Sequence, residues 1–297
     1  METTLNTDHL RLFLTVLAAG SFTRAADLAG SDKAHVSRVI SRLEDQLGTR
    51  LLNRSTRALS PTDAGQELAT RARAILDALA DTEQALKGRA DQPRGRLRIT
   101  CGYEFGLLAV NGWVRAFLER WPVVSVEVDF TNRVADIVYE GFDIAIRVGR
   151  LPDSDLVARK LGEVSYGFYV APSYLDRHGV PDHPADLRSE GFISFTGSPA
   201  DVACGAETCA LPSAPRYIAN TNMAVRDMAV AGLGVALLPD FQAAPFVAAG
   251  QLSPLLHGWS RPRVEVHAVM PSTRLMSATV RAFIDLARDV DILKSMA

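Results

Sequence analysis

The stretch that decides the fold is "SDKAHVSRVISRLEDQLGTRLLNRSTR", residues 31–57. Its six Lys and Arg residues outnumber three acids, so it carries a net charge of +3 in a chain whose formal net charge is −2. A basic segment this local indicates a polyanionic partner, and DNA is the one to test. The alternative is a solvated basic face on an ordinary helical subdomain.

Three short helices are predicted in the first fifty residues. Ser21 or Thr23 can cap the second helix, and Asp32 or Ser31 the third. A glycine turn between the second and third helices is typical of a helix-turn-helix, which places its second helix in the major groove. The apolar residues of the first and third helices have the spacing of one buried face: Leu10, Phe13, Leu14 and Leu17, then Val36, Ile40, Leu43 and Leu47.

The residues expected to contact DNA lie on the polar side of the third helix and in the basic turn that follows it. Two short apolar pieces flank the polar turn "NRSTR", as in a two-stranded wing whose tip reaches phosphates or the minor groove. The predicted set is Lys33, His35, Ser37, Arg38, Arg42, Arg54 and Arg57.

A long helix is predicted after the wing, with Pro61 in its first turn. Its apolar positions follow a heptad spacing of four and three: Leu68, Ala72, Ile75, Leu79, Thr82 and Leu86. Spacing alone fits either a coiled-coil seam or a helix that lies on its own protein. A homodimer is favoured because two copies of the DNA-binding part would bind two half-sites. The segment that follows is predicted to be a hinge between domains, because it contains Gly, Pro and charged residues: "GRADQPRGR".

Strands and helices alternate beyond the hinge, which is the pattern of an α/β fold. The first block has strands at 96–100, 124–130 and 142–149, with helices at 105–121 and 133–141 between them. A second block contains strands at 166–172, 192–195, 216–220 and 234–239 and a helix at 222–232, before a strand at 263–271 and a last helix from Ser277. Ligands bind beyond the carboxyl ends of such strands.

Several residues in those loops are candidates for holding a small molecule. Thr100 and Cys101 end a strand where a helix begins, so they could hold a polar group, whereas Glu104 argues against a strongly anionic ligand. Arg147 lies in an apolar strand, where a buried charge needs a partner. It is predicted either to form an internal ion pair or to bind a group of the ligand. Tyr103 and Phe195 are aromatic residues in these loops.

The segments "FLTVLAAGSFTRAADLA" and "VSRVISRLEDQLGTRLLNRSTRALSPTDAG", together with the length of 297 residues, resemble the LysR-type transcriptional regulators. The resemblance implies a winged helix-turn-helix at 1–60, a linker helix for dimerisation at 61–90, and at 91–297 an effector-binding domain of two α/β lobes like the periplasmic binding proteins. The last strand and helix would return to the first lobe. The chain departs from the family pattern at Ala29, Ser31 and Asp32.

The resemblance also implies the partners. These are double-stranded promoter DNA, a small and polar effector, and further copies of the chain, as a homodimer through the linker helix and then a tetramer. Thr100, Cys101, Asn132, Arg147, Val148, Gly149 and Asn222 would line the effector pocket, besides Tyr103 and Phe195.

Other classes of protein find little support in the sequence. Complete nucleotide-binding, zinc-protease or serine-hydrolase motifs are absent, so we expect no enzyme, metal or cofactor. A periplasmic solute-binding protein would need an export signal, and no apolar run approaches a membrane span, so a cytoplasmic protein is expected. Within the regulator interpretation, Cys204 and Cys209 offer a thiol-based redox sensor as an alternative, against two incidental thiols.

Overall fold

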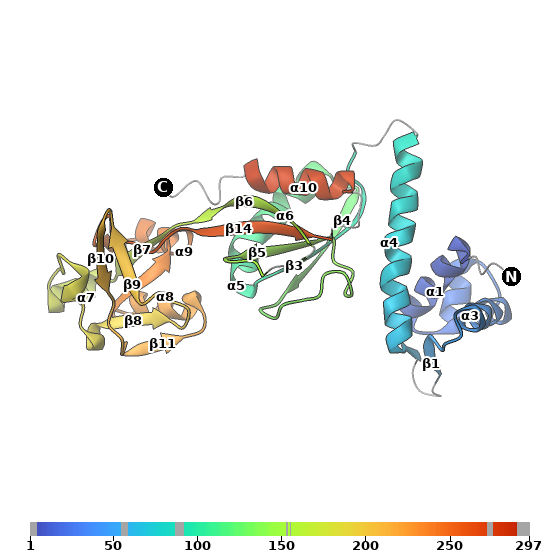
Figure 1. Ribbon diagram of the computed structural model, residues 1–297, viewed down its shortest axis with the longest axis horizontal. Helices are drawn as coiled ribbons and strands as arrows, with labels where there is room; N and C mark the ends of the chain where they lie inside the picture. The colour runs from blue at the N-terminus through green and yellow to red at the C-terminus, as the bar shows by residue number, and fades with distance from the viewer. Residues whose placement is uncertain are drawn as a thin grey trace. The chain divides into compact units, whose positions relative to one another are not determined.

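The computed structural model describes residues 5–54, 59–86, 92–152, 154, 156–271 and 276–289. The chain divides into two compact units. The first unit comprises Met1–Pro93, Ala135–Asp143 and Thr273–Thr279, and the second Arg94–Val134, Ile144–Ser272 and Val280–Ala297. Figure 1 shows a small helical domain with a long helix in the first unit and two sheets in the second.

The N-terminal part of the first unit is a winged helix-turn-helix. Its elements are α1 (Thr7–Ala19), α2 (Phe22–Ala29), α3 (Lys33–Leu47) and the antiparallel strands β1 (Leu52–Arg54) and β2 (Leu59–Pro61). Each helix ends at a glycine in the left-handed region, which residues with a side chain rarely adopt. One apolar core holds the three helices together, and its buried residues include Phe13, Val16, Val36, Ile40 and Leu43.

Helix α4 (Asp63–Leu86) starts directly after β2. The Thr62 hydroxyl caps it by accepting a hydrogen bond from the Gly65 N–H (3.0 Å) and donates to the Arg50 carbonyl (2.7 Å). A Cβ on Gly65 would lie 2.0 Å from the Leu51 carbonyl oxygen, so only glycine fits where the helix crosses the chain before β1. The prediction that Pro61 occupies the first helical turn is wrong, because Pro61 pairs with Leu52 as the last residue of β2.

The first sheet of the second unit has the strand order β4-β3-β5-β14-β6. Strands β3 and β4 and strands β3 and β5 are parallel, whereas β14 runs antiparallel to β5 and β6. The strands are β3 (Gly95–Cys101), β4 (Val124–Phe130), β5 (Ile144–Val148), β6 (Val157–Val164) and β14 (Val264–Met270). The helices are α5 (Tyr103–Phe105), a π-helical turn (Gly106–Val110), α6 (Asn111–Arg120) and α10 (Ala278–Asp289).

The second sheet of this unit has the order β11-β8-β12-β7-β13. Its strands are β7 (Tyr166–Val170), β8 (Phe192–Phe195), β11 (Tyr217–Ala219), β12 (Val235–Pro239) and β13 (Ser253–Leu255). The helices α7 (Pro172–His178), α8 (Asn222–Val230) and α9 (Asp240–Ala248) accompany it, with short 3-10 turns at Pro184–Asp186 and Ser189–Gly191. The hairpin of β9 (Asp201–Cys204) and β10 (Glu207–Ala210) completes the lobe.

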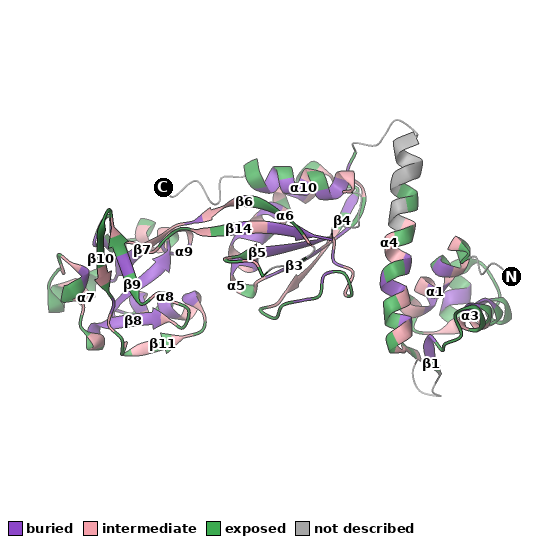
Figure 2. Cartoon of the chain, in the orientation of Figure 1, coloured by how far each residue is buried: buried purple, intermediate pink, exposed green. Residues whose placement is uncertain are grey.

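Buried residues follow the strands and the inner faces of the helices in each part (Figure 2). The last strand and helix do return to the first lobe: β14 joins its sheet, and Phe283 of α10 packs edge-on against Phe117 of α6 at 5.3 Å between ring centroids. The expected two-lobed α/β architecture is therefore confirmed.

The helix expected at 133–141 is not present in the structure, where this segment forms turns. The Asp136 carboxylate accepts hydrogen bonds from the backbone N–H groups of Val138 (3.1 Å) and Tyr139 (2.9 Å). Such a local side-chain bond competes with the helical hydrogen-bond ladder. Ala135 and Ile137 are buried whereas Val138 and Tyr139 are exposed, so the buried residues lie two apart and do not form the apolar face that would hold a helix in place.

Candidate DNA-binding surface and effector site

Helix α3 buries Val36, Ile40 and Leu43 as the sequence pattern predicts, whereas Leu47, the last residue of the predicted face, is exposed. The side chains of Lys33, His35, Arg38 and Arg42 are exposed and that of Ser37 is half-buried. Arg54 is the last residue of β1, while its side chain and the whole of Arg57 lie outside the described residues. Five cationic or polar side chains of one helix thus share a solvent-facing side.

Asp32 begins α3 as its N-cap. Its carboxylate accepts a hydrogen bond from the His35 backbone N–H at 2.7 Å. The negative charge lies at the positive end of the helix dipole, where it stabilises the helix. Asp32, one of the residues at which the chain departs from the family pattern, therefore serves as the helix cap. The cap fixes the first turn of α3, from which Lys33 and His35 project.

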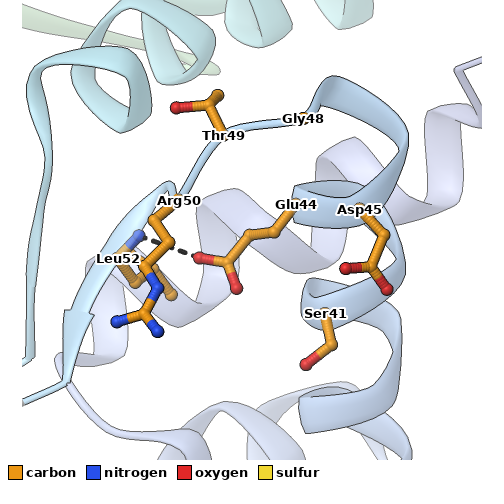
Figure 3. Close-up of a pocket in the computed structure, with 7 residues that line it drawn as sticks. All are labelled: Ser41, Glu44, Asp45, Gly48, Thr49, Arg50 and Leu52. Atoms are coloured by element: carbon orange, nitrogen blue, oxygen red, sulfur yellow. Dashed lines mark hydrogen bonds between the residues drawn. The ribbon is translucent and has the colours of Figure 1, made fainter.

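Glu44 attaches the end of α3 to the wing (Figure 3). One carboxylate oxygen accepts hydrogen bonds from the backbone N–H groups of Leu51 (2.9 Å) and Leu52 (3.2 Å). Leu51 and Leu52 are buried in the core of the unit, so the start of β1 is held at a fixed place beside α3. A cavity of about 560 Å³ lies at this junction, and its lining includes Ser41, Glu44, Asp45 and Arg50. Sequence analysis missed this role of Glu44.

Two large apolar residues of the heptad are exposed on α4. Ile75 and Leu79 keep 45% and 36% of their surface exposed, whereas Ala72 is buried and Leu68 half-buried. Thr82 and Leu86 belong to the helix, but their side chains lie outside the described part. The first half of the heptad therefore packs within its own unit, and the exposed positions begin at Ile75.

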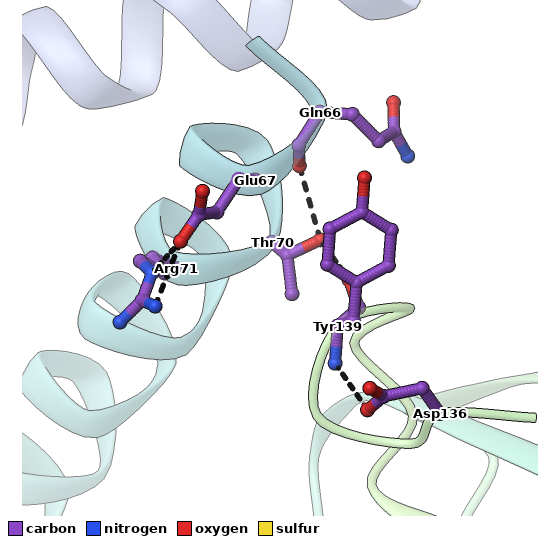
Figure 4. A network of polar contacts seen from close by, with 6 residues as sticks. All are labelled: Gln66, Glu67, Thr70, Arg71, Asp136 and Tyr139. Carbon is purple, nitrogen blue, oxygen red and sulfur yellow. Dashed lines mark hydrogen bonds and ion pairs between the residues drawn. The ribbon is translucent and has the colours of Figure 1, made fainter. Parts of the chain in front are cut away.

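The segment Ala135–Asp143 belongs to the same compact unit as α4. Figure 4 shows Thr70 of α4 next to this segment. The Thr70 hydroxyl lies 2.8 Å from the Tyr139 carbonyl oxygen and 3.2 Å from the Gln66 carbonyl oxygen, both of which accept hydrogen bonds. Thr70 is buried, so its hydroxyl depends on these carbonyls rather than on water.

Thr100 and Cys101 end β3 and are both fully buried. The Thr100 hydroxyl oxygen has no hydrogen-bond partner among the described residues. Burial raises the pKa of the Cys101 thiol to about 12, against the opposing effect of the nearby Arg147 guanidinium. Cys101 is therefore a neutral thiol within the lobe, and a Cβ added to Gly106 would meet its sulfur at 2.6 Å.

The other predicted effector residues lie at the ends of neighbouring strands. The Asn132 side chain accepts a hydrogen bond from the Tyr103 backbone N–H (3.1 Å), which joins the loops after β3 and β4. Arg147 of β5 is opposite His267 of β14. Tyr103, Asn132 and Val148 are exposed, Arg147, Gly149 and Phe195 are half-buried, and Asn222 is buried.

Glu104 connects the two lobes of the second unit, a role that sequence analysis missed. Its carboxylate accepts hydrogen bonds from the backbone N–H groups of Asn222 (3.2 Å) and Met223, the first residues of α8. These N–H groups have no partner within the helix, and the helix dipole favours an anion there. The chain thus supplies its own carboxylate to a place where a ligand anion would also bind.

Cys204 and Cys209 lie on the β9–β10 hairpin as free thiols. Cys204 is opposite Glu207 and Cys209 is opposite Val202, so the two cysteines are diagonal neighbours. Diagonal neighbours lie about 7–8 Å apart, whereas the Cα atoms of a disulfide lie about 4.4–6.8 Å apart. Both side chains pack against the apolar core of their lobe.

Within the described ranges, no helix is long and apolar enough to cross a membrane. The same residues contain no cluster of three or more His, Cys, Asp or Glu side chains placed to bind a metal ion.

A winged helix-turn-helix with an exposed polar helix face, followed by a long helix and two α/β lobes, is the architecture of a DNA-binding protein that carries a separate α/β domain. Residues 7–66 match the family model "Bacterial regulatory helix-turn-helix protein, lysR family", and residues 90–291 match the model "LysR substrate binding domain". The chain belongs to the LysR family of transcriptional regulators. Proteins of this family bind DNA and small-molecule effectors and form oligomers, and the chain is not an enzyme.

Similar proteins agree with this assignment. An HTH-type transcriptional regulator of Xanthomonas campestris pv. campestris is 35% identical over 285 residues, which cover 92% of this chain and 82% of the relative. The activator AaeR of Escherichia coli K12 is 30% identical, with 95% and 92% of the two chains covered. The solved structure of CrgA from Neisseria meningitidis is 29% identical, covers 96% and 99% of the chains, and superposes with a TM-score of 0.59.

Proposed function

We propose that the chain binds double-stranded DNA sequence-specifically, with α3 in the major groove and the wing on the backbone or in the minor groove. The observation that carries this proposal is the exposed side of α3, where Lys33, His35, Arg38 and Arg42 project from a capped and packed helix. Ser37 stands among them, half-buried. Arg54 and Arg57 of the wing would add phosphate contacts. The domains we propose remain 1–60, 61–90 and 91–297.

Dimerisation through α4 is the second part of the proposal. Exposed Ile75 and Leu79 would be covered by the same residues of a second copy, and two such dimers would form a tetramer. The variant with both Ile75→Asp and Leu79→Asp should be monomeric in sedimentation velocity, because two carboxylates would be buried at the seam. Ala80→Asp, which adds one charge at an adjacent exposed position, should keep the parent oligomer. An unchanged oligomer in the double variant would contradict this interface.

A small polar effector is proposed to bind where Thr100, Asn132, Arg147 and Asn222 end or follow their strands. The buried Thr100 hydroxyl, which lacks a partner among the described residues, would gain one from the ligand. A ligand beside Glu104 would compete with its contact to α8, so binding would change how the two lobes are held together. The effector thereby shifts a population of conformations.

The turn segment 135–143 would carry this change towards α4. It follows the loop that contains Asn132 and precedes β5, which contains Arg147, and its Tyr139 carbonyl accepts the Thr70 hydroxyl of α4. A shift of the loop at Asn132 or of the start of β5 would move segment 135–143. That movement would act on α4 through the hydrogen bond between Tyr139 and Thr70. Altered packing of the linker helices would change the spacing of the two DNA-binding parts.

Thermal-shift screening of small polar metabolites on the full-length protein tests the effector site, because a ligand that binds only the folded state raises the melting temperature. We expect at least one compound to raise the melt and change affinity for DNA, and Thr100→Val to lose both effects. Thr70→Val should keep the thermal shift and lose the change in DNA affinity. Hits that depend on Thr100 but never alter DNA binding would contradict the proposal.

The redox alternative gains no support from the hairpin register, which places Cys204 and Cys209 diagonally. A disulfide between them would require the backbone to move. Intact-mass analysis after mild peroxide should therefore show no loss of two hydrogens between these thiols. Formation of that bond would restore the alternative.

A further inference from the structure

A second cavity lies in the second lobe. It has a volume of about 360 Å³ and lies between the start of β7, the first residue of α9 and the chain from Pro254 to Arg263. Figure 1 shows β7 and α9 in this lobe. None of the nine residues proposed for the effector lines this cavity, whose wall includes Tyr166, Asp240, Trp259 and Arg261.

Arg261 is the side chain of this cavity that is best suited to bind a ligand. Its guanidinium lies over the Tyr166 ring, with Cζ 4.8 Å from the ring centroid. Its Nε is buried and has no hydrogen-bond partner among the described residues, and no ion pair of this side chain is found in that part of the chain. The planar guanidinium carries several N–H donors in a fork that matches a carboxylate.

The walls on both sides of Arg261 are held in place. The Ser260 hydroxyl donates to the Tyr166 carbonyl at 2.6 Å, and the backbone of Ser260 is paired with that of Ala203 in both directions (2.8 and 3.0 Å). Tyr166 and Arg261 are therefore fixed relative to each other before any ligand arrives, which reduces the entropy lost on binding.

Leu256, another wall residue, has a φ of 52°, the one positive φ of a non-glycine residue in the described ranges. The Trp259 N–H donates to the Leu256 carbonyl at 3.0 Å and closes the turn. Residues with a side chain rarely adopt the left-handed region, and backbone strain of this kind clusters at functional sites. This turn brings the largely buried Trp259 to the cavity wall.

The charge balance of the lining favours one negative ligand group. Among the lining residues Arg261 and Arg263 are cationic and Asp240 is anionic, a sum of +1 with His257 neutral, but the exposed Arg263 lies 3.9 Å from the Glu163 carboxylate. Arg261 is therefore the lining cation for which the described part of the chain supplies no ion pair. Asp240 accepts a hydrogen bond from the Tyr169 hydroxyl at 2.8 Å, which engages one of its oxygens within the protein. An anion at Arg261 therefore meets net attraction in a partly desolvated place.

We propose that this cavity is a second ligand site, which binds a small organic carboxylate: the carboxylate pairs with Arg261, and a flat apolar body lies against Tyr166 and Trp259. The two proposed sites share no lining residue. A cavity of this size holds a molecule of one ring.

Binding of 4-fluorobenzoate to the full-length protein, followed by fluorine NMR titration, tests the site. We expect saturable binding, with Arg261→Met at least 10-fold weaker and the neutral 4-fluorobenzamide at least 10-fold weaker than the carboxylate. Arg120→Met is the matched control: Arg120 also lies over a ring, that of Trp121 at 4.8 Å, but lines no part of this cavity, so the variant should bind as the parent does. Thr100→Val should also bind normally.

A second variant covers the case in which Arg261→Met does not fold. Arg263→Glu changes an exposed side chain at the rim and turns the lining charge from +1 to −1, so binding should weaken severalfold without unfolding. Absence of saturable binding to the parent would overturn the site. So would parental affinity in Arg263→Glu together with parental affinity in any folded Arg261→Met.

Discussion

Two glutamates, one in each unit, make the same kind of contact at very different distances along the chain. Glu44 accepts the N–H groups of Leu51 and Leu52, seven and eight residues away. Glu104 accepts those of Asn222 and Met223, 118 and 119 residues away. The first contact forms whenever the small helical core folds, whereas the second requires two separate sheets to come together. The same carboxylate chemistry therefore fixes the start of the wing beside α3 in one unit and offers a separable contact between two lobes in the other.

Glu44→Ala should have the largest effect. It leaves two buried backbone donors without their acceptor, which costs about 1–3 kcal/mol, and it releases the start of the wing. Thermal unfolding and DNA titration measure both consequences. Asp45→Ala is the control, because Asp45 lines the same cavity but is exposed, and such surface changes stay within about 0.5 kcal/mol. Equal melting temperatures for the two variants would remove the structural role of Glu44.

Glu104→Gln should have an intermediate effect. The neutral amide keeps one acceptor but loses the charge, and charge-assisted hydrogen bonds are about twice as strong as neutral ones. We expect faster amide hydrogen exchange at Asn222 and Met223 with little change in global stability. Glu119→Gln, which loses an exposed pairing with Arg115 on α6, is the control. Unchanged exchange at α8 would mean that the Glu104 contact does not hold the lobes together.

Thr100→Val should have the smallest effect, and in the stabilising direction. Valine keeps the shape of the side chain and removes a buried hydroxyl that lacks a partner in the described structure. Relieving that group is worth about 1 kcal/mol, a rise of roughly 2–4 °C in melting temperature. Differential scanning calorimetry without ligand measures it. A lower melt would show that the hydroxyl is satisfied in the native protein.

The difference between the two units also explains what the sequence could predict. In α3, exposure follows from a helical period, so the pattern around Val36 and Ile40 was enough to place Lys33 and Arg38 on the outer side. Of the two caps that the sequence offered for α3, Asp32 and Ser31, the structure uses Asp32, whose carboxylate accepts the His35 N–H three residues on. The return of β14 to the first sheet followed from the family resemblance and is confirmed.

The effector site was less predictable because its residues come from separate strands. Thr100 was proposed from its position at a strand end and Asn222 from the family resemblance, yet no local pattern says that Glu104 reaches the start of α8. The helix expected at 133–141 failed because a single side chain, Asp136, offered its backbone another set of hydrogen bonds. The role of Glu44 could have been suspected from the sequence, because this acid lies within a basic segment and just before the glycine that ends α3.

The central claim is that α3 reads base pairs, and selection of bound sequences from random duplex DNA by the full-length protein tests it most directly. The parent should recover paired half-sites one or more helical turns apart. Arg38→Ala should lose the preference for one base pair in each half-site, whereas Arg54→Ala should keep the motif with weaker binding and a salt slope reduced by about 1. Arg11→Ala on α1 is the control for an exposed arginine elsewhere. Recovery of the unchanged motif with unchanged affinity by Arg38→Ala would contradict the account.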